Sequence, residues 1–320
     1  MKRYLTYPLL VCFAFFYVSC NQVIELDLPA PEDSIVVEGY IENGIPPYVL
    51  LTRNTPFFGG LSLNDISTYF INGALVKVYN ETDTVQLIEL CLQDLPASVQ
   101  AQAAAAFGYS VTDSTAEIPN ICVYTVPNYV NFYLGDTAGV FVGQFKTTYN
   151  LLIEVEGQTL TASTYIPDEL LFTLSLRPHD DQTKDSLVSV RVTYDDPDTT
   201  GNFLRYFTKR NDESYYTALS GSVYDDNVIG GQTVTLPVER GQASNEDIDT
   251  ETYGYFWKGD TVQVRFSSIS KSHYDFWNTL ENDGGDSPFS SPIKIKTNIK
   301  GGLGIWGGYG SHTETIIIPE

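Results

Sequence analysis

The feature that most constrains the fold is a long succession of short β-type runs separated by turn residues. Val, Ile, Thr and Tyr dominate the runs, and Gly, Asn, Asp and Pro stand between them. In the first half the runs cover residues 34–41, 48–53, 74–79, 85–90, 121–126, 149–154 and 159–165. In the second half they cover residues 171–176, 186–194, 203–208, 215–218, 233–236, 261–267, 293–299 and 314–318. Because they do not alternate with helix-length segments, the pattern predicts an all-β chain of antiparallel sheets.

The length of the chain and the position of a strand-ending proline predict two β-sandwich domains in series. A chain of 320 residues accommodates two domains of ordinary size. Ile166-Pro167 ends the last run of the first half, so we expect an N-terminal domain over residues 34–167 and a C-terminal domain over 168–320. Two short helices are also expected. One is Ala-rich and covers residues 94–108; the other covers 270–282, with Tyr274, Trp277 and Leu280 on one face.

The N-terminus predicts export and a lipid anchor. Lys2 and Arg3 precede an apolar run that is too short to span a bilayer, and the run ends at Ser19-Cys20. We therefore interpret residues 1–19 as a lipoprotein signal peptide and Cys20 as the acylated residue. Residues 20–33 have no periodicity, contain two prolines and are expected to form a tether. The alternative is an ordinary signal peptide whose cleavage leaves a soluble periplasmic protein.

The cysteine count predicts one disulfide. After Cys12 leaves with the signal and Cys20 is acylated, Cys91 and Cys122 remain as a pair in an oxidising compartment. Two buried free thiols are the alternative. No metal site and no cofactor are expected, because two cysteines without a nearby histidine fall short of the four ligands of structural zinc.

The charge of the chain excludes one class of partner. With 40 acidic and 18 basic residues, the formal net charge is −22. Nucleic-acid binding depends on Lys and Arg that neutralise phosphates, so a nucleic-acid partner is not expected.

Several segments resemble a known family. They are Ile35-Val36-Val37-Glu38-Gly39-Tyr40-Ile41, Asn72-Gly73-Ala74-Leu75-Val76, Tyr149-Asn150-Leu151-Leu152-Ile153 before Gly157, and Asn298-Ile299 through Gly302-Leu303-Gly304-Ile305-Trp306. With the lipoprotein start, their order is similar to that in domain of unknown function 4249. The resemblance covers nearly the whole mature chain. The Ala-rich insertion departs from it.

The resemblance implies an outer-membrane lipoprotein encoded beside TonB-dependent transporters. It also implies a first domain similar to transthyretin-like or carboxypeptidase-regulatory sandwiches; for the second we expect an Ig-like sandwich. No catalytic residue carries over from the family. Which face of the outer membrane the protein occupies is left open.

Three patterns are candidate sites, each with a plainer structural interpretation. Gly302 to Gly307 matches G-x-G-x-x-G but lacks the following helix of a dinucleotide site, so the glycines are expected to allow a turn or a close backbone approach. Two acidic clusters offer calcium ligands without the EF-hand spacing, and solvated turns are their default. They are Asp195, Asp196, Asp198 and Asn202, and Glu246, Asp247, Asp249 and Glu251. Several aromatic residues could form an exposed platform that binds a sugar or a partner, or could be buried in a core. They are Tyr253, Tyr255, Phe256, Trp257, Trp277, Trp306 and Tyr309.

These observations favour a binding role. We expect a binding or accessory subunit of an outer-membrane, TonB-dependent transport complex, with Phe57, Phe58 and Phe107 as candidate partner-binding residues because they are apolar side chains in long loops. One alternative is a surface hydrolase acting on glycan or peptide, for which no catalytic motif is found. The other is a structural, adhesin-like lipoprotein.

Overall fold

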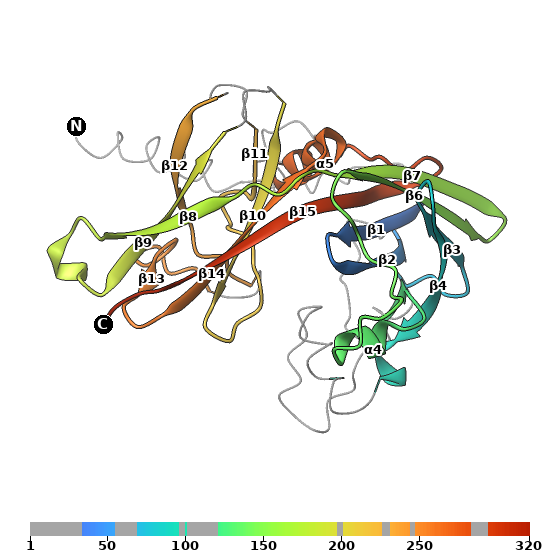
Figure 1. Ribbon diagram of the computed structural model, residues 1–320, viewed down its shortest axis with the longest axis horizontal. Coiled ribbons are helices and arrows are strands. Elements are labelled where there is room, and N and C mark those ends of the chain that lie inside the picture. Colours follow the sequence, from blue (N-terminus) through green and yellow to red (C-terminus); the bar gives the residue numbers. More distant parts are fainter. Residues whose placement is uncertain are drawn as a thin grey trace, which may run out of the picture. The chain divides into compact units, whose positions relative to one another are not determined.

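Long-range strand pairing dominates the part of the chain that the structure describes. The computed structural model describes residues 34–54, 69–95, 100, 121–196, 201–225, 231–243, 247–282 and 294–320 (Figure 1). The strands of the first half are β1 (Ile35–Glu42), β2 (Ile45–Arg53), β3 (Leu75–Tyr79), β4 (Thr84–Cys91), β5 (Cys122–Thr125), β6 (Thr147–Val155) and β7 (Gln158–Ile166). Those of the second half are β8 (Phe172–Pro178), β9 (Leu187–Asp195), β10 (Phe203–Arg210), β11 (Val223–Asp225), β12 (Thr233–Val238), β13 (Phe256–Trp257), β14 (Thr261–Ile269) and β15 (Leu303–Ile317).

The first core lies between parts of one 11-stranded sheet. The strand order is β11-β10-β14-β15-β1-β2-β5-β4-β3-β6-β7. Alternate residues of β1, β2, β5, β3, β6 and β7 point inward, which is what a half-buried strand requires. Val37, Val49, Tyr124, Leu151 and Leu160 are among these buried residues. The all-β prediction is confirmed.

The second core lies between β8, β9, β12 and β13 on one side and β10 and β14 on the other. Strands β9, β12 and β13 belong to a 4-stranded sheet in which β8 also pairs with β9. Val190 and Val192 of β9 pack in one cluster with Tyr206 of β10 and with Val264 and Phe266 of β14. Burying these branched and aromatic side chains from both sheets is the main favourable term in the stability of such a sandwich.

Strand β15 joins strands from both halves of the chain. Its first part pairs in parallel with β1, and its second part pairs antiparallel with β14. The predicted boundary near residue 167 lies between β7 and β8, and residues 33–320 form one compact unit. The β1–β15 pair is a parallel exception to the antiparallel pairing that we predicted.

The glycines of β15 explain a segment that the sequence assigned to a turn. Gly304, Gly307, Gly308 and Gly310 lie within the strand. A Cβ at Gly304 would stand 2.0 Å from the carbonyl oxygen of Val37, and one at Gly308 would stand 2.7 Å from that of Tyr165. The expectation of close backbone approach is confirmed, whereas that of a Gly-rich turn before a strand at 314–318 is wrong.

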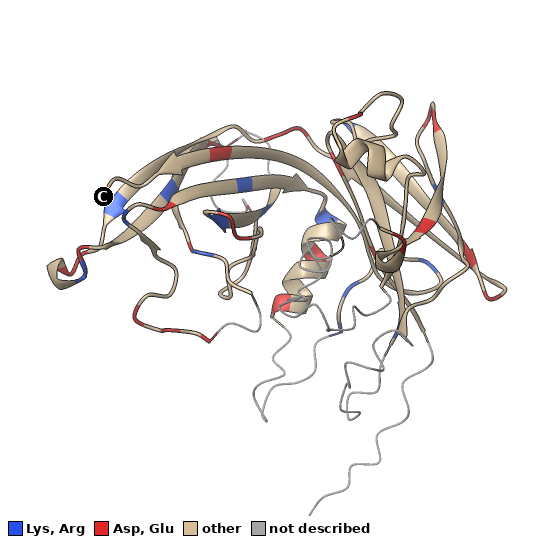
Figure 2. Ribbon diagram, turned by 90° about the horizontal axis from the view of Figure 1, so that it is seen from below, with Lys and Arg blue, Asp and Glu red and all other residues tan. Residues whose placement is uncertain are grey.

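The amphipathic helix is confirmed, with a different buried face. Helix α5 (Lys271–Glu281) begins after Ser270, which occupies the N-cap position without a side-chain capping bond. Its buried residues are His273 and Phe276, and Leu280 is 38% exposed. The helix packs against β10, β11 and β15. Over the described chain as a whole, acidic and basic residues are distributed among many elements (Figure 2).

Other local expectations have mixed outcomes. The helix predicted at 94–108 falls mostly outside the described residues. The described residues just before it, Leu92–Asp94, form a 3-10 turn. A second helix, α4 (Tyr129–Tyr133), was not predicted. Residues 294–299 are not a strand, and the run 215–218 contributes only a single bridge, from Tyr216 to Thr208. Among the residues that the structure describes, no helix is long and apolar enough to cross a membrane.

Candidate functional site

The strands β15, β1, β2, β5 and β4 present one face to the first core and the opposite face away from it. We call this opposite surface the outer face. Its membership follows from register: Tyr40 of β1 pairs with Tyr48 of β2, Tyr48 with Thr125 of β5, and Thr125 with Ile88 of β4. The outer face comprises Leu303, Ile305, Gly307, Val36, Glu38, Tyr40, Tyr48, Leu50, Thr52, Val123, Thr125, Ile88 and Leu90.

The outer face is apolar and remains partly open to solvent. Tyr48 is 37% exposed, Ile88 41% and Leu303 42%, while Leu50 and Val123 are half-buried. Among these outer-face positions Glu38 is the one charged side chain. Tyr40, Ile305 and Thr125 on the same face are buried. Exposed apolar side chains that share one face of a sheet favour an interaction site.

One end of the outer face carries a small cluster of its own. Leu92 and Ile121 are buried there, and Leu50, Phe70 and Leu95 pack against them. Phe70 lies opposite Thr52 in an isolated bridge, so it belongs to the same side of the sheet. The described segments that flank residues 55–68 and 96–120 lie at this end, since Phe70, Leu95 and Ile121 all belong to this cluster.

The start of β1 lies at the same end. Ser34 N–H donates to Asn54 Oδ1 at 2.9 Å, and Asn54 N–H donates to Ser34 O at 3.2 Å. Because β1 and β2 are antiparallel, the beginning of β1 meets the end of β2. Ser34, the first residue after the predicted tether, therefore lies at the end of the sheet that carries the cluster of Leu92 and Ile121.

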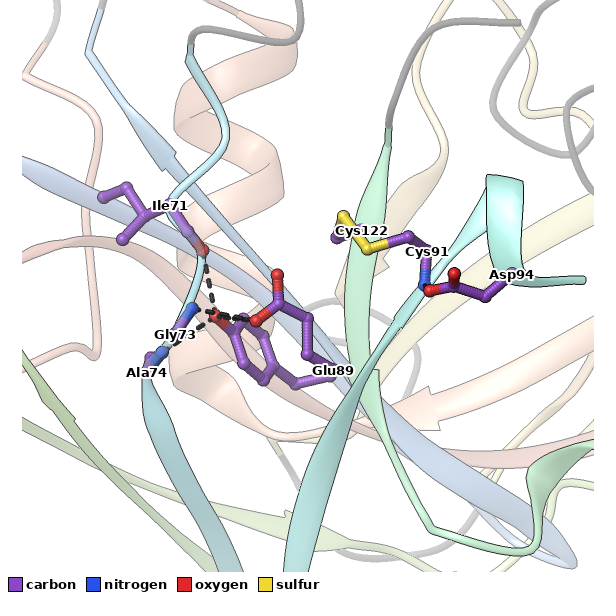
Figure 3. The surroundings of a disulfide bond; sticks show 8 residues. Ile71, Gly73, Ala74, Glu89, Cys91, Asp94 and Cys122 are labelled. Atoms are coloured by element: carbon purple, nitrogen blue, oxygen red, sulfur yellow. Dashed lines mark hydrogen bonds between the residues drawn. A yellow bond between two sulfur atoms is a disulfide. The ribbon is translucent and has the colours of Figure 1, made fainter.

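The predicted disulfide is present beneath this end (Figure 3). Cys91 of β4 and Cys122 of β5 are directly opposed in the ladder, with a sequence separation of 31. The next pair along is joined by Leu92 N–H donating to Ile121 O at 2.9 Å. The cystine thus occupies a non-hydrogen-bonded pair, where opposed side chains are closest. It closes the base of the excursion over residues 96–120.

Glu89 lies beside the disulfide without forming a metal site in the oxidised protein. Its Oε2 accepts a hydrogen bond from Gly73 N–H at 2.8 Å and lies 3.5 Å from the Tyr124 hydroxyl. The ligand atoms of Glu89, Cys91 and Cys122 lie within 4.8 Å of one another. While the sulfurs are bonded to each other, however, neither is a thiolate ligand.

A buried arginine fixes α5 at the border of the outer face. Arg205, 5% exposed, donates from Nε to Ser222 Oγ at 2.9 Å and from Nη1 to the Tyr309 hydroxyl at 2.7 Å. Its guanidinium carbon lies 3.4 Å from the centroid of the Trp277 ring, and Nη2 lies 3.9 Å from Glu281 Oε1. Burial of a cation requires such partners, and Arg combines stacking with directed hydrogen bonds.

The environment of Glu38 is unusual for an exposed carboxylate. Its side chain contacts solvent, yet the surrounding protein desolvates it and raises its pKa, against the Arg205 charge and the nearby Tyr40 hydroxyl. Desolvation also raises the pKa of Tyr48 well above its usual value, and the charge of Glu38 adds to this shift. Exposed area and desolvation differ here because apolar side chains and rings surround a group that is still open on one side.

The structure places the sequence-predicted candidates in different environments. Cys20, Phe57, Phe58 and Phe107 lie outside the described residues, as do Asp198 and Glu246. Asp195 lies opposite Thr233 in the β9–β12 pair and accepts a hydrogen bond from Thr233 Oγ1, whereas Asp249 serves a local turn by accepting from Glu251 N–H. The proposed aromatic platform is divided between cores, since Trp306 is fully buried in the first and Phe256 in the second.

The three histidines have separate partners. His179 Nδ1 accepts from Asp181 N–H at 3.0 Å, and His273 Nδ1 lies 3.3 Å from Gly308 O. His312 lies between Glu169 and Glu314, at 2.9 and 3.0 Å. Within the described residues none of these partners is a serine hydroxyl, so no Ser-His pair of a hydrolase forms from them.

Sequence reasoning missed the outer face and Glu38 as a site. The alternation of β1 does separate Glu38 and Tyr40 from Val37 and Ile41. It does not reveal which strands lie beside β1, and the apolar character of the outer face depends on those neighbours. Arg205 was missed for the same reason, since its partners come from residues 222, 277, 281 and 309.

Comparison with known proteins identifies the family but no named relative. A search of curated proteins finds no match to this chain. A family model described as a domain of unknown function (DUF4249) matches residues 22–315, which is most of the chain. The β-rich fold, the confirmed strand segments and this match agree with the resemblance noted in the sequence, and the chain belongs to the DUF4249 family.

Proposed function

We propose that this protein is a lipid-anchored binding subunit of an outer-membrane transport complex, with a TonB-dependent transporter as its partner. The observation that carries the proposal is the position of the outer face at the end where β1 begins. A protein held to a membrane through residues 20–33 brings that end within reach of membrane proteins. Fourteen extended residues span roughly 50 Å at most.

The composition of the outer face supports a protein partner. Protein interfaces combine exposed aromatic and aliphatic anchors with few charges at their centre. Tyr48, Ile88 and Leu303 are exposed anchors of this kind in a chain whose net charge is −22. A hydrolase would need converging carboxylates or a nucleophile–base pair, and the outer face offers Glu38 alone.

Two variants test the proposal in the membrane-bound protein. Replacing Ile88 and Leu303 together by Gln should abolish co-purification with the transporter, because both side chains are exposed and would lie in the interface. The unfolding midpoint should change little, since exposed apolar side chains contribute little to the core. The control is Ile317→Gln at the other end of β15, where the isoleucine is 68% exposed. It should retain the transporter.

The anchor is tested separately. Cys20→Ala should release the protein into the soluble fraction, because stable membrane attachment requires the acyl chains. If the wild-type lipoprotein co-purifies with no integral membrane protein, the proposed subunit role is wrong, whatever the anchor variant does.

A further inference from the structure

We propose that the outer face receives one amphipathic helix of the partner, lying beside α5, and that a Lys or Arg of this helix pairs with Glu38. This inference rests on the proposed function and identifies the chemistry of the partner. It follows from the position of Glu38 on the outer face, from the distribution of basic residues along the chain and from the width of the outer face.

Glu38 is the one charged side chain among the outer-face positions, and the Arg205 charge and the nearby Tyr40 hydroxyl are the groups that favour its ionised form. Leu50 lies opposite it on β2 and Ile305 opposite it on β15. Neither neighbour can pair with a carboxylate. In the free protein Glu38 keeps contact with solvent, but covering the outer face with an apolar partner would remove that contact. A carboxylate enclosed in this way is tolerated only when a cation or several donors pair with it.

The chain itself supplies no further cation for Glu38. Outside the described residues, its basic side chains are Lys2 and Arg3 of the signal peptide alone, so residues 55–68 and 96–120 contain neither Lys nor Arg. Among the described cations, Arg205 lowers the Glu38 pKa, but its hydrogen bonds go to Ser222 and Tyr309. Arg265 pairs with Glu42 at 3.6 Å. The complementary charge must come from another chain.

The uncovered width of the outer face matches one helix. From β1 through β2 and β5 to β4 there are three strand spacings, roughly 14 Å. A helix with its side chains is about 10–12 Å wide. On its β15 side the outer face is already covered by α5, whose Trp277 ring stacks on Tyr40 with centroids 6.5 Å apart and whose Phe276 packs in one cluster with Tyr40 and Ile305. A helix in this position would contact Tyr48, Leu50 and Ile88 with its apolar stripe.

The test is photo-crosslinking in the native outer membrane. The photoreactive residue p-benzoylphenylalanine replaces Ile88, and separately Tyr48, in the full lipidated chain. Illumination should link it to a transporter segment that carries a Lys or Arg within one helical turn. Glu38→Gln should lower the yield about tenfold, the effect expected for loss of one close interfacial charge pair. Glu38→Lys should lower it further, and changing the partner's basic residue to Glu should restore crosslinking to Glu38→Lys.

Controls separate this inference from the proposed function. Glu154→Gln removes an exposed carboxylate from β6, away from the outer face, and should leave the yield unchanged. If the transporter crosslinks equally well with Glu38→Gln, the charge pairing is wrong while the subunit role stands. Crosslinking to residues of this chain itself would overturn the intermolecular helix. Absence of any transporter crosslink from both positions would overturn the proposed function.

Discussion

At the scale of single residues, His312 joins two segments through its charge. It lies on β15 between Glu314 of the same strand and Glu169 of the connection between β7 and β8. Burial opposes protonation of the ring, but hydrogen bonds to Glu314 and Glu169 and their charges outweigh it, so the pKa of His312 is raised. Its protonated form therefore stabilises the fold.

The pH dependence of this contribution has a definite sign. Because the folded pKa lies above the unfolded value of about 6.5, the contribution is complete below that pH and is lost as pH rises through the folded pKa. We expect His312→Gln to lower the free energy of unfolding by about 0.5–1 kcal/mol more at pH 5.5 than at pH 8.5. Denaturant titrations at the two pH values measure this difference, and an equal loss at both would show that the ring acts by packing alone.

His273 has the opposite behaviour and serves as an internal comparison. Complete burial and the charge of Arg205 lower its pKa to about 3, against the hydrogen bond to Gly308. It is neutral in the folded protein near neutral pH, and its contribution to stability is lost as pH falls from about 6.5 toward 3. Acid thus weakens the contact between α5 and β15 while it strengthens the contacts of His312.

At the scale of elements, the packing of α5 on β15 depends on a missing side chain. A Cβ at Gly307 would stand 2.5 Å from His273 Cε1 and 2.6 Å from His273 Nε2. We expect Gly307→Ala to lower the free energy of unfolding by about 1–3 kcal/mol, because overpacking forces the helix or the strand to shift. Equilibrium unfolding in denaturant measures the loss.

A double-mutant cycle identifies the cause of that loss. Combining Gly307→Ala with His273→Ala should cost less than the sum of the single changes, since the shortened side chain leaves room for the new methyl group. Gly308→Ala is the matched control. Its Cβ would meet the backbone oxygen of Tyr165 at 2.7 Å, so His273→Ala should not relieve it. If the losses from Gly307→Ala and His273→Ala were strictly additive, the new methyl group would not be in contact with the His273 ring.

At the scale of the whole molecule, the disulfide limits how far the chain can open at the end of the outer face. Cys91–Cys122 closes a loop with a sequence separation of 31. By the loop-entropy relation, Cys91→Ser/Cys122→Ser should lower the free energy of unfolding by about 3–4 kcal/mol. Hydrogen exchange should increase first around Leu92 and Ile121, next to the excursion, and only later in β6 and β7. Uniform exchange across the sandwich would contradict this local role.

Much of the local structure was determined by the sequence. The β-type residues of 34–41 and 159–165, bounded by turn residues, predicted β1 and β7, and the spacing of aromatic residues after Ser270 predicted α5. Pairing arithmetic predicted the Cys91–Cys122 bond. These features depend on side-chain periodicity and on composition within a short window, so a single sequence contains them.

Features that depend on distant strands were decided by the tertiary structure alone. The glycines of residues 304–310 suggested a turn, and only the approach of Val37, Tyr165 and His273 explains why they lie within a strand. Likewise, the alternation of β1 places Glu38 opposite the core side, but its apolar surroundings come from Leu50 and from Ile305, far along the chain. The physical reason is that strand order and register are set by non-local packing. The same exposed carboxylate would be an ordinary solvated charge beside other strands.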